Sequence, residues 1–196
     1  MKIGTYDLNT NRKPFILAEC CNNFQDSLPI ALRMIEFAAN CGADGVKFQH
    51  RRRLSVDQLV ELRLAAKANG LQFICTAYDY AGIGDVATLT DAFKIGSAEV
   101  ASQEFCKAVF QLANVVDKPV IVSTGGMEWK DVKRVAAQAV GYDVPIVLLQ
   151  CTSIYPTPPQ FTNLNVMQHY QMLGTDHLVD FHPGYSDHTG RVEYPI

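Results

Sequence analysis

The sequence lacks the features of membrane-embedded, secreted and zinc-binding proteins. No stretch of its 196 residues approaches the ~20 consecutive apolar residues that cross a bilayer. The N-terminus has no apolar core of a signal peptide. None of the six cysteines stands in a Cys-x-x-Cys spacing, which argues against zinc and thiol-redox motifs. We therefore expect no membrane partner, reduced cysteines and a cytoplasmic location.

An excess of charge of one sign is also missing. The net charge is −3 and the isoelectric point is near 5.9, which gives no electrostatic basis for binding nucleic acid. The only basic cluster runs from His50 to Arg53, and a solvated loop or an anion contact is its more typical meaning. With 48% hydrophobic residues, the chain has enough apolar surface for one sizeable core.

Strand-like and helix-like segments alternate along the chain. Apolar runs typical of buried parallel strands cover residues 15–19, 45–49, 72–76, 92–96, 119–124 and 145–149, and a last run ends near 186. Caps and helical spacing predict helices over 28–40, 55–69, 102–115, 128–140 and 164–172. Polar residues follow nearly every strand, which favours an α/β fold of the (β/α)8 TIM-barrel type over an open sheet with one switch point.

The predicted barrel is incomplete. About seven strands are present, whereas a complete barrel needs eight strands and ~250 residues. We expect residues 14–196 to form a partial barrel domain. Residues 1–13, with a turn signal at Asn9-Thr10-Asn11, are expected to form a short hairpin that covers the barrel bottom. A fragment, a truncated gene product and a barrel closed by a partner chain remain alternative explanations.

Two lysines, Lys47 and Lys94, stand inside apolar strands. A buried lysine needs a charge partner or a ligand. One interpretation is an internal ion pair with Glu19 or Glu99. The functional interpretations are an anion clamp for phosphate or carboxylate, or a Schiff-base nucleophile. Two lysines near several hydroxyls favour the clamp, because a Schiff base requires one desolvated, deprotonated amine.

Short hydroxyl side chains and glycines follow several strands. They are Ser97, Ser123, Thr124, Gly125, Gly126, Thr152 and Ser153. Glycines let the backbone approach an anion closely, and a following helix N-terminus favours negative charge. Each of these residues alone is an ordinary cap, but together with the two lysines they predict a phosphate site.

Two carboxylates and one imidazole complete the candidate set. Glu19 ends the first strand and Glu99 follows the fourth, so either is a candidate general base or ligand of a sugar hydroxyl. Their alternative role is to neutralise a neighbouring lysine. His188, next to Asp187, is a candidate ligand for a divalent metal, although one histidine is a weak metal signal.

With these residues and motifs the chain resembles the sialic acid synthase family, which includes N-acetylneuraminate, legionaminate and pseudaminate synthases. The matching segments are 16–19, 42–49, 94–97, 118–125, 151–159 and 184–189. The resemblance implies a transferase that condenses phosphoenolpyruvate with an N-acetylated amino sugar, typically N-acetylmannosamine. The products are a nonulosonic (sialic-type) acid and phosphate. It also implies a divalent metal, Mn²⁺ or Mg²⁺, that polarises the sugar aldehyde, and a homodimer.

The resemblance also assigns roles to individual residues. Positions matching the phosphoenolpyruvate site are Lys47, Lys94, Ser97, Ser123, Ser153 and Ser186. The implied catalytic residues are Glu19, Lys47 and Glu99, with Glu19 handling the proton of the attacking water. Glu99 and Tyr155 match contacts to the sugar, and His188 matches one of two metal histidines.

The chain departs from the family pattern in several places. Residues 23–26 read Asn-Phe-Gln-Asp where the family usually reads Asn-His-Asn-Gly, and Gln150 stands where many members carry histidine. The loop from Gln49 to Ser55 is shorter than usual. The second metal histidine, the last strand and the antifreeze-like domain would lie beyond Ile196. The alternatives are therefore a catalytically impaired barrel that binds phosphoenolpyruvate or phosphate, a Schiff-base lysine aldolase, and a non-enzymatic scaffold.

Overall fold

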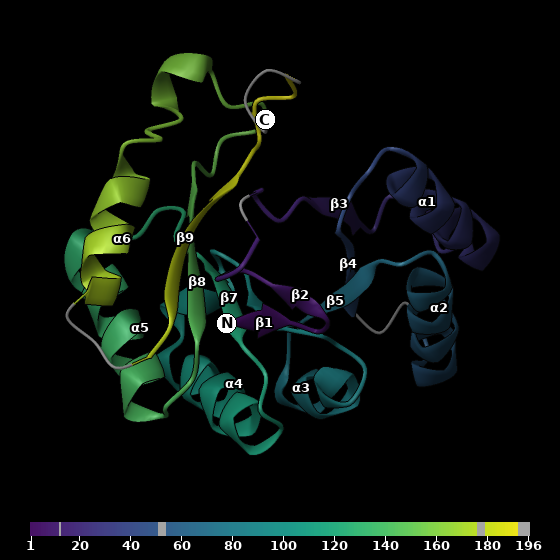
Figure 1. Ribbon diagram of the computed structural model, residues 1–196, viewed down its shortest axis with the longest axis horizontal. Coiled ribbons are helices and arrows are strands. Elements are labelled where there is room, and N and C mark those ends of the chain that lie inside the picture. Colours follow the sequence, from purple (N-terminus) through teal and green to yellow (C-terminus); the bar gives the residue numbers. More distant parts are fainter. Residues whose placement is uncertain (12, 51–53, 176–178, 192–196) are drawn as a thin grey trace. The chain divides into compact units, whose positions relative to one another are not determined.

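The computed structural model describes residues 1–11, 13–50, 54–175 and 179–191. The chain divides into two compact units, Met1–Lys94 and Ile95–Ile196. In each unit parallel strands alternate with helices, as the sequence predicted (Figure 1). The arginines of the basic cluster, residues 51–53, lie outside the described residues.

The first unit opens with a two-stranded antiparallel hairpin of β1 (Lys2–Ile3) and β2 (Tyr6–Asp7). The two strands are joined by a turn at Gly4 and Thr5, where Gly4 adopts φ +57°. The turn signal at residues 9–11 corresponds to a second turn that follows β2, where the Asn11 N–H donates to the Asp7 carbonyl oxygen (3.2 Å). The Thr5 backbone N–H donates to Gln72 Oε1 (3.2 Å), and Gln72 Nε2 donates to Thr5 Oγ1 (2.9 Å). Since Gln72 begins the strand β5, the hairpin covers the amino end of that strand, as expected.

Parallel strands of the first unit pair in chain order. They are β3 (Leu17–Cys21), β4 (Gly45–His50), β5 (Gln72–Ala77) and β6 (Phe93–Ile95). All six residues of β5 are buried, which explains its continuous apolar pattern. The Phe48 ring stacks on that of Phe73 and meets that of Phe24 at a tilt, with ring centroids 6.1 Å apart in both pairs.

Helices α1 (Leu28–Asn40) and α2 (Val56–Ala68) pack side by side in this unit (Figure 1). The predicted cap at Ser55 is confirmed, because its hydroxyl accepts the Gln58 N–H (3.2 Å) and the Gln58 side chain accepts the Ser55 N–H (2.9 Å). Helix α3 (Tyr80–Ala87) was not predicted. Two glycines among its eight residues weaken the helical signal, and the Asp79 side chain caps it by accepting the Gly82 N–H (2.7 Å).

In the second unit the parallel strands are β7 (Val120–Ser123), β8 (Ile146–Cys151) and β9 (Phe181–Ser186), paired in chain order. The helices are α4 (Gln103–Val115), α5 (Trp129–Gly141) and α6 (Val166–Thr175), and the 3-10 turns are η1 (Glu99–Ala101) and η2 (Pro159–Phe161). Within the described ranges, no helix is both long and apolar enough to traverse a bilayer.

One buried carboxylate ties three elements of the first unit together. Asp91 Oδ2 accepts hydrogen bonds from Lys67 Nζ (2.6 Å) and from the backbone N–H of Phe73 (2.7 Å). Lys67 Nζ also donates to Gln72 Oε1 (2.9 Å), which binds the hairpin. Removing the carboxylate would leave the buried Phe73 amide without its acceptor and the Lys67 ammonium without its counter-charge.

We predict that Asp91→Ala lowers the free energy of unfolding by roughly 2–4 kcal/mol, because a buried N–H loses its acceptor and the Lys67 ammonium loses its counter-charge. The change is measured by urea denaturation of the 196-residue chain. Glu104→Ala is the matched control, since Glu104 contacts Lys107 on the exposed face of α4 and should change stability by less than about 0.5 kcal/mol. Equal effects of the two substitutions would contradict the structural role of Asp91.

Candidate functional site

Lys47 forms an ion pair with Glu19 within the first unit. The register of β3 and β4 places Glu19 opposite Lys47, and paired residues of neighbouring strands point to the same face. Lys47 Nζ lies 2.7 Å from Glu19 Oε2, and the lysine side chain is 6% exposed. The backbone N–H of Cys21 donates to Glu19 Oε1 (2.8 Å) and fixes the carboxylate. The internal ion pair that the sequence left open therefore exists.

Lys94 projects from the same face of this sheet as Lys47. The register pairs Lys47 with Ile74, and Lys94 with Thr76. Ile74 and Thr76 are two residues apart on β5 and so share a face. Both lysines are buried. The two ammonium groups thus lie on one face of the sheet, near the carboxyl ends of parallel strands, and this is the arrangement that an anion clamp requires.

Thr76 is a candidate residue that sequence reasoning missed. It lies on β5, between the strands that carry Lys47 and Lys94, and it is 1% exposed. Its Oγ1 is buried without a hydrogen-bond partner among the described residues. An unsatisfied buried hydroxyl is unfavourable, so a ligand acceptor would relieve it. A hydroxyl at the end of a buried strand, as at Ser123, was the signal that could have identified it.

Gly125 is the centre of a hydroxyl cluster in the second unit. Its backbone N–H donates to Ser97 Oγ (3.1 Å), and Ser97 Oγ lies 3.2 Å from Cys151 Sγ. A side chain at position 125 would collide with Ser97, Cys151 and Ser153. Glycine is therefore required here by close approach. Ser97, Gly125, Cys151 and Ser153 form what we call the hydroxyl cradle.

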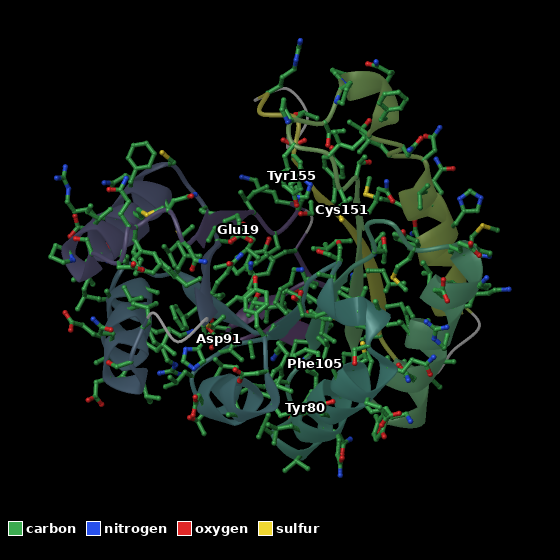
Figure 2. The ribbon with its side chains drawn as sticks, turned by 180° about the vertical axis from the view of Figure 1, so that it is seen from behind. Glu19, Tyr80, Asp91, Phe105, Cys151 and Tyr155 are labelled. Atoms are coloured by element: carbon green, nitrogen blue, oxygen red, sulfur yellow. The ribbon has the colours of Figure 1, made fainter. Side chains whose placement is uncertain are left out.

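Ser123 and Ser186 lie on the cradle's face of their sheet. Ser123 pairs with Leu149 and Ser186 with Cys151, and Leu149 and Cys151 share a face because they are two residues apart on β8. The second unit thus brings the four predicted serines to one region at the carboxyl ends of its strands. Figure 2 shows Tyr155 near Cys151, on the loop that follows β8.

His188 lies against Tyr155, with ring centroids 4.2 Å apart. His188 Nδ1 is 2.9 Å from the carbonyl oxygen of Thr152. A carbonyl only accepts, so Nδ1 carries the proton and Nε2 of the neutral ring keeps its lone pair. Glu99 begins η1, and its carboxylate lies against Gly96.

The donor set for a metal is not complete in the described residues. No group of three His, Cys, Asp or Glu side chains gathers in them. Asp187 is engaged elsewhere, because its Oδ1 accepts from Tyr185 Oη (2.9 Å) and the Thr189 N–H (3.1 Å). Its Oδ2 accepts from Thr189 Oγ1 (3.0 Å). Of the pair Asp187 and His188, the histidine is thus the available ligand, and one imidazole by itself does not hold Mn²⁺ or Mg²⁺ well.

Two residues that depart from the family pattern, Phe24 and Gln150, make contacts that stabilise the fold. Phe24 is fully buried against Phe48. Gln150 lies on the opposite face of β8 from Cys151, where its Nε2 donates to the Thr162 carbonyl oxygen (3.1 Å) and its Oε1 accepts from Tyr170 Oη (3.4 Å). Neither side chain belongs to the hydroxyl cradle.

A cation beside the hydroxyl cradle was also missed. Arg134, on α5, lines a cavity of 290 Å³ together with Ser97 and Gly125. Its Nη1 donates to Asp131 Oδ1 (2.7 Å). The i, i+3 spacing of Asp131 and Arg134 indicates a helix-surface ion pair, which gave no sign that the arginine borders the cradle.

The sequence of the chain is similar to those of proteins of one family. The profile of the NeuB family matches residues 50–196. N-acetylneuraminate-9-phosphate synthase of Homo sapiens is 29% identical, over 89% of this chain and 55% of its own length. N,N'-diacetyllegionaminic acid synthase of Campylobacter jejuni is 28% identical, over 94% of this chain and 64% of its own length. The chain thus spans 55–64% of the length of these relatives.

A solved structure supports the fold. The N-acetylneuraminic acid synthetase of Leptospira borgpetersenii, in complex with citrate, superposes with a TM-score of 0.80 at 24% identity, over 92% of this chain and 67% of the other. The sequence-based expectation of an incomplete α/β barrel with a short N-terminal hairpin is confirmed.

Thiols next to Lys47 are predicted to be unreactive. Burial raises the pKa of Cys75 to about 12, and burial together with the Glu19 charge raises the pKa of Cys20 to about 12. Both therefore stay protonated near neutral pH, whereas Cys41 is exposed. With iodoacetamide at about pH 8, mass spectrometry should find Cys41 alkylated and Cys20 and Cys75 unmodified. In concentrated guanidinium all three should react. Rapid alkylation of Cys75 in the folded chain would contradict its burial.

Proposed function

Since the chain belongs to the NeuB family, we propose that it takes part in a phosphoenolpyruvate-dependent condensation with an N-acetylated amino sugar. The products would be a nonulosonic acid and inorganic phosphate. The names of the relatives support this reaction class, because they are synthases of N-acetylneuraminate-9-phosphate and of N,N'-diacetyllegionaminic acid. N-acetylmannosamine is the proposed acceptor for the first assays.

The observation that carries the proposal is the pair of buried lysines on one sheet face. In a synthase that uses phosphoenolpyruvate as a substrate, these ammonium groups would neutralise the carboxylate and the phosphate of that substrate. Thr76, between them, would donate its unsatisfied hydroxyl proton. In the second unit, the hydroxyl cradle has neutral hydroxyl groups on Ser97 and Ser153, and such groups also suit the oxygens of a phosphate group.

Glu19 and Glu99 are proposed to act on protons and on the sugar. Glu19 is half-exposed and hydrogen-bonded to Lys47. In the proposed reaction it would accept the proton of the water that adds to the enol carbon. Glu99 and Tyr155 are proposed to contact hydroxyl groups of the sugar. We propose that His188 Nε2 supplies one ligand of a divalent metal, which would polarise the acceptor aldehyde; further ligands would have to come from outside the described residues.

A phosphoenolpyruvate-binding barrel that does not catalyse condensation is the second candidate function. It would require only the buried lysines Lys47 and Lys94, whereas no group of three His, Cys, Asp or Glu side chains gathers in the described residues. The assay is sugar-dependent phosphate release by the purified chain with Mn²⁺, phosphoenolpyruvate and N-acetylmannosamine. Release that requires the sugar supports condensation. Binding of phosphoenolpyruvate without release supports the second candidate.

Lys94→Met is predicted to weaken phosphoenolpyruvate binding by about tenfold or more, because a charge-assisted hydrogen bond in a buried site is lost. Calorimetric titration of the 196-residue chain measures the affinity. Lys107→Met removes an exposed ammonium on α4 and should leave the affinity unchanged. The proposal fails if neither Lys94→Met nor Lys47→Met alters binding.

The Schiff-base alternative is tested on the same chain. Borohydride reduction in the presence of pyruvate would trap a covalent adduct on an aldolase lysine. We expect no adduct, since the Lys47 side chain is held by the Glu19 carboxylate, with Nζ 2.7 Å from Oε2. A mass increase at Lys47 or Lys94 would support the aldolase instead.

A further inference from the structure

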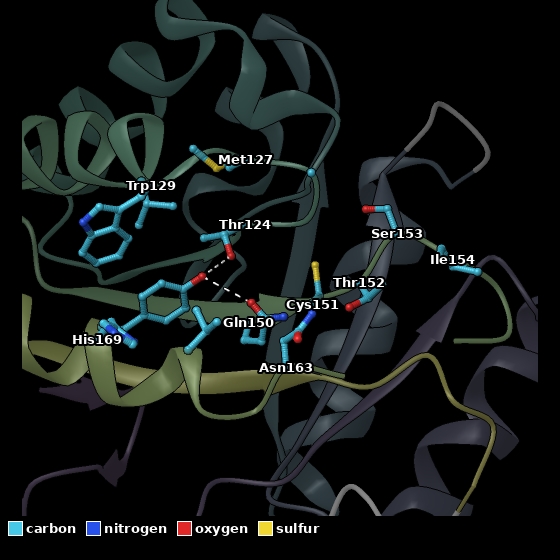
Figure 3. A pocket seen from close by; sticks show the side chains of 14 residues that line it. Thr124, Met127, Trp129, Gln150, Cys151, Thr152, Ser153, Ile154, Asn163 and His169 are labelled. Carbon is cyan, nitrogen blue, oxygen red and sulfur yellow. Dashed lines mark hydrogen bonds between the residues drawn. The ribbon is translucent and has the colours of Figure 1, made fainter. Parts of the chain in front are cut away.

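The second unit contains a cavity whose aromatic residues have no role in the proposed reaction. It has a volume of 820 Å³ and lies between the first turns of α5 and α6, the loop after β7 and the carboxyl end of β8 (Figure 3). Glu99 and Tyr155, which are proposed to contact the sugar, are not among the residues that line it. Small-molecule sites typically enclose roughly 300–1,000 Å³, so the cavity is large enough for a ligand other than the two substrates.

Three aromatic rings form one wall of this cavity. The Trp129 ring lies nearly parallel to that of Tyr170, with centroids 6.2 Å apart and an interplanar angle of 11°. The His169 ring meets the indole edge-on, with centroids 6.1 Å apart. Trp129 nevertheless remains 42% exposed. An indole that two neighbouring rings hold in place, and that stays partly exposed, is a platform on which a flat ring can stack.

The polar groups of the inner wall are bonded to one another. Tyr170 is buried, and its hydroxyl lies 2.7 Å from Thr124 Oγ1 and donates to Gln150 Oε1 (3.4 Å), as the dashed lines of Figure 3 show. Gln150 Nε2 donates to the Thr162 carbonyl oxygen (3.1 Å). Burial raises the pKa of Tyr170, so its hydroxyl stays neutral in the physiological range. These groups need no ligand to complete their hydrogen bonds.

Polar groups of the rim are engaged in the same way. Asn163 Nδ2 and Thr152 Oγ1 both donate to the Phe161 carbonyl oxygen, at 3.1 and 2.7 Å. A sugar carries several hydroxyl groups, each of which would lose its water and need a new partner in the cavity. Because these side chains of the wall and the rim already bond to protein atoms, the cavity is better suited to a ligand with few polar groups.

The rest of the lining favours an uncharged, apolar ligand. Met127, Val132, Ile154 and Val166 add apolar side chains to the aromatic wall. No Asp, Glu, Lys or Arg side chain of the described residues lines the cavity. A ligand with a permanent charge would therefore lose its hydration here without gaining a charged partner.

We propose that this cavity binds a neutral, planar aromatic ligand, such as a fused heterocycle, which stacks on the exposed part of Trp129. The planar shape follows from the indole platform, and the neutrality and low polarity follow from the other lining residues. The inference goes beyond the proposed function and does not depend on it, because it uses neither the buried lysines nor the hydroxyl cradle.

Trp129 is the only tryptophan of the chain, so its fluorescence reports on this cavity directly. Caffeine serves as the probe, because it is a neutral, planar fused-ring compound without hydroxyl groups. Titration with caffeine should quench the emission saturably and should protect the indole from quenching by acrylamide. Quenching that rises linearly with the caffeine concentration, without protection from acrylamide, would indicate collisions in solution only and would overturn the proposal.

Two further compounds test the shape and the polarity of the ligand. Cyclohexanol is neutral and mostly apolar but not planar, whereas N-acetylmannosamine is neutral but rich in hydroxyl groups. Both should leave the emission of Trp129 unchanged at concentrations at which caffeine saturates the cavity. A response to cyclohexanol as strong as that to caffeine would overturn the requirement for an aromatic ring. A stronger response to N-acetylmannosamine than to caffeine would overturn the assignment as a whole.

Variants separate stacking from the fold. By calorimetry, Trp129→Ala should weaken caffeine binding by about tenfold, whereas Trp129→Phe should retain most of it, because an aromatic face remains. Phe37→Ala is the matched control, since it removes an exposed aromatic ring from α1 in the first unit and should leave the affinity unchanged. Circular dichroism verifies that each variant is folded. Unchanged caffeine affinity in folded Trp129→Ala would overturn the proposal.

Discussion

The register of the parallel strands decides which side chains can act together. Residues that pair across a parallel ladder share a face, and the side-chain period of two carries this relation along each strand. Glu19, Lys47 and Lys94 share a face for this reason, as do Ser123, Cys151 and Ser186. A one-residue slip of β4 would turn Lys47 towards the helices and leave Glu19 without its partner. The apolar alternation that buries Val46 and Phe48 also fixes the register, so the core and the site have one origin.

Much of this arrangement could be predicted from the sequence, because it follows from apolar runs and helix caps. The strands that carry Lys47 and Lys94, the cap at Ser55 and the glycine at position 125 lie where those patterns placed them. The hairpin turn and α3 could not be predicted. Their formation depends on contacts between distant residues, such as Thr5 with Gln72, and on an Asp cap that rescues a glycine-rich helix.

The residues that sequence reasoning missed became recognisable only through burial and neighbours. Thr76 resembles any strand threonine until its hydroxyl is seen to lack a partner between two lysine-bearing strands. Trp129 begins the amphipathic helix α5, and His169 lies on another helix, α6. Both residues line one cavity because α5 and α6, whose first residues are 37 positions apart in the chain, flank the same end of β8 (Figure 3). Periodicity reports which face of a helix is buried, but not which helices enclose a space.

The ion pair between Lys47 and Glu19 and the proposed anion clamp are compatible. A buried ammonium without a counter-charge is unfavourable, so the unliganded chain needs a carboxylate near Lys47. Glu19 is 51% exposed, whereas Lys47 is 6% exposed, so the carboxylate can turn to water while the ammonium cannot. An anion that reaches Lys47 would therefore replace Glu19 at low cost and leave it beside the ligand, where the proposed reaction needs a base. The asymmetry of burial within the pair is what makes one lysine suitable both for stability and for binding.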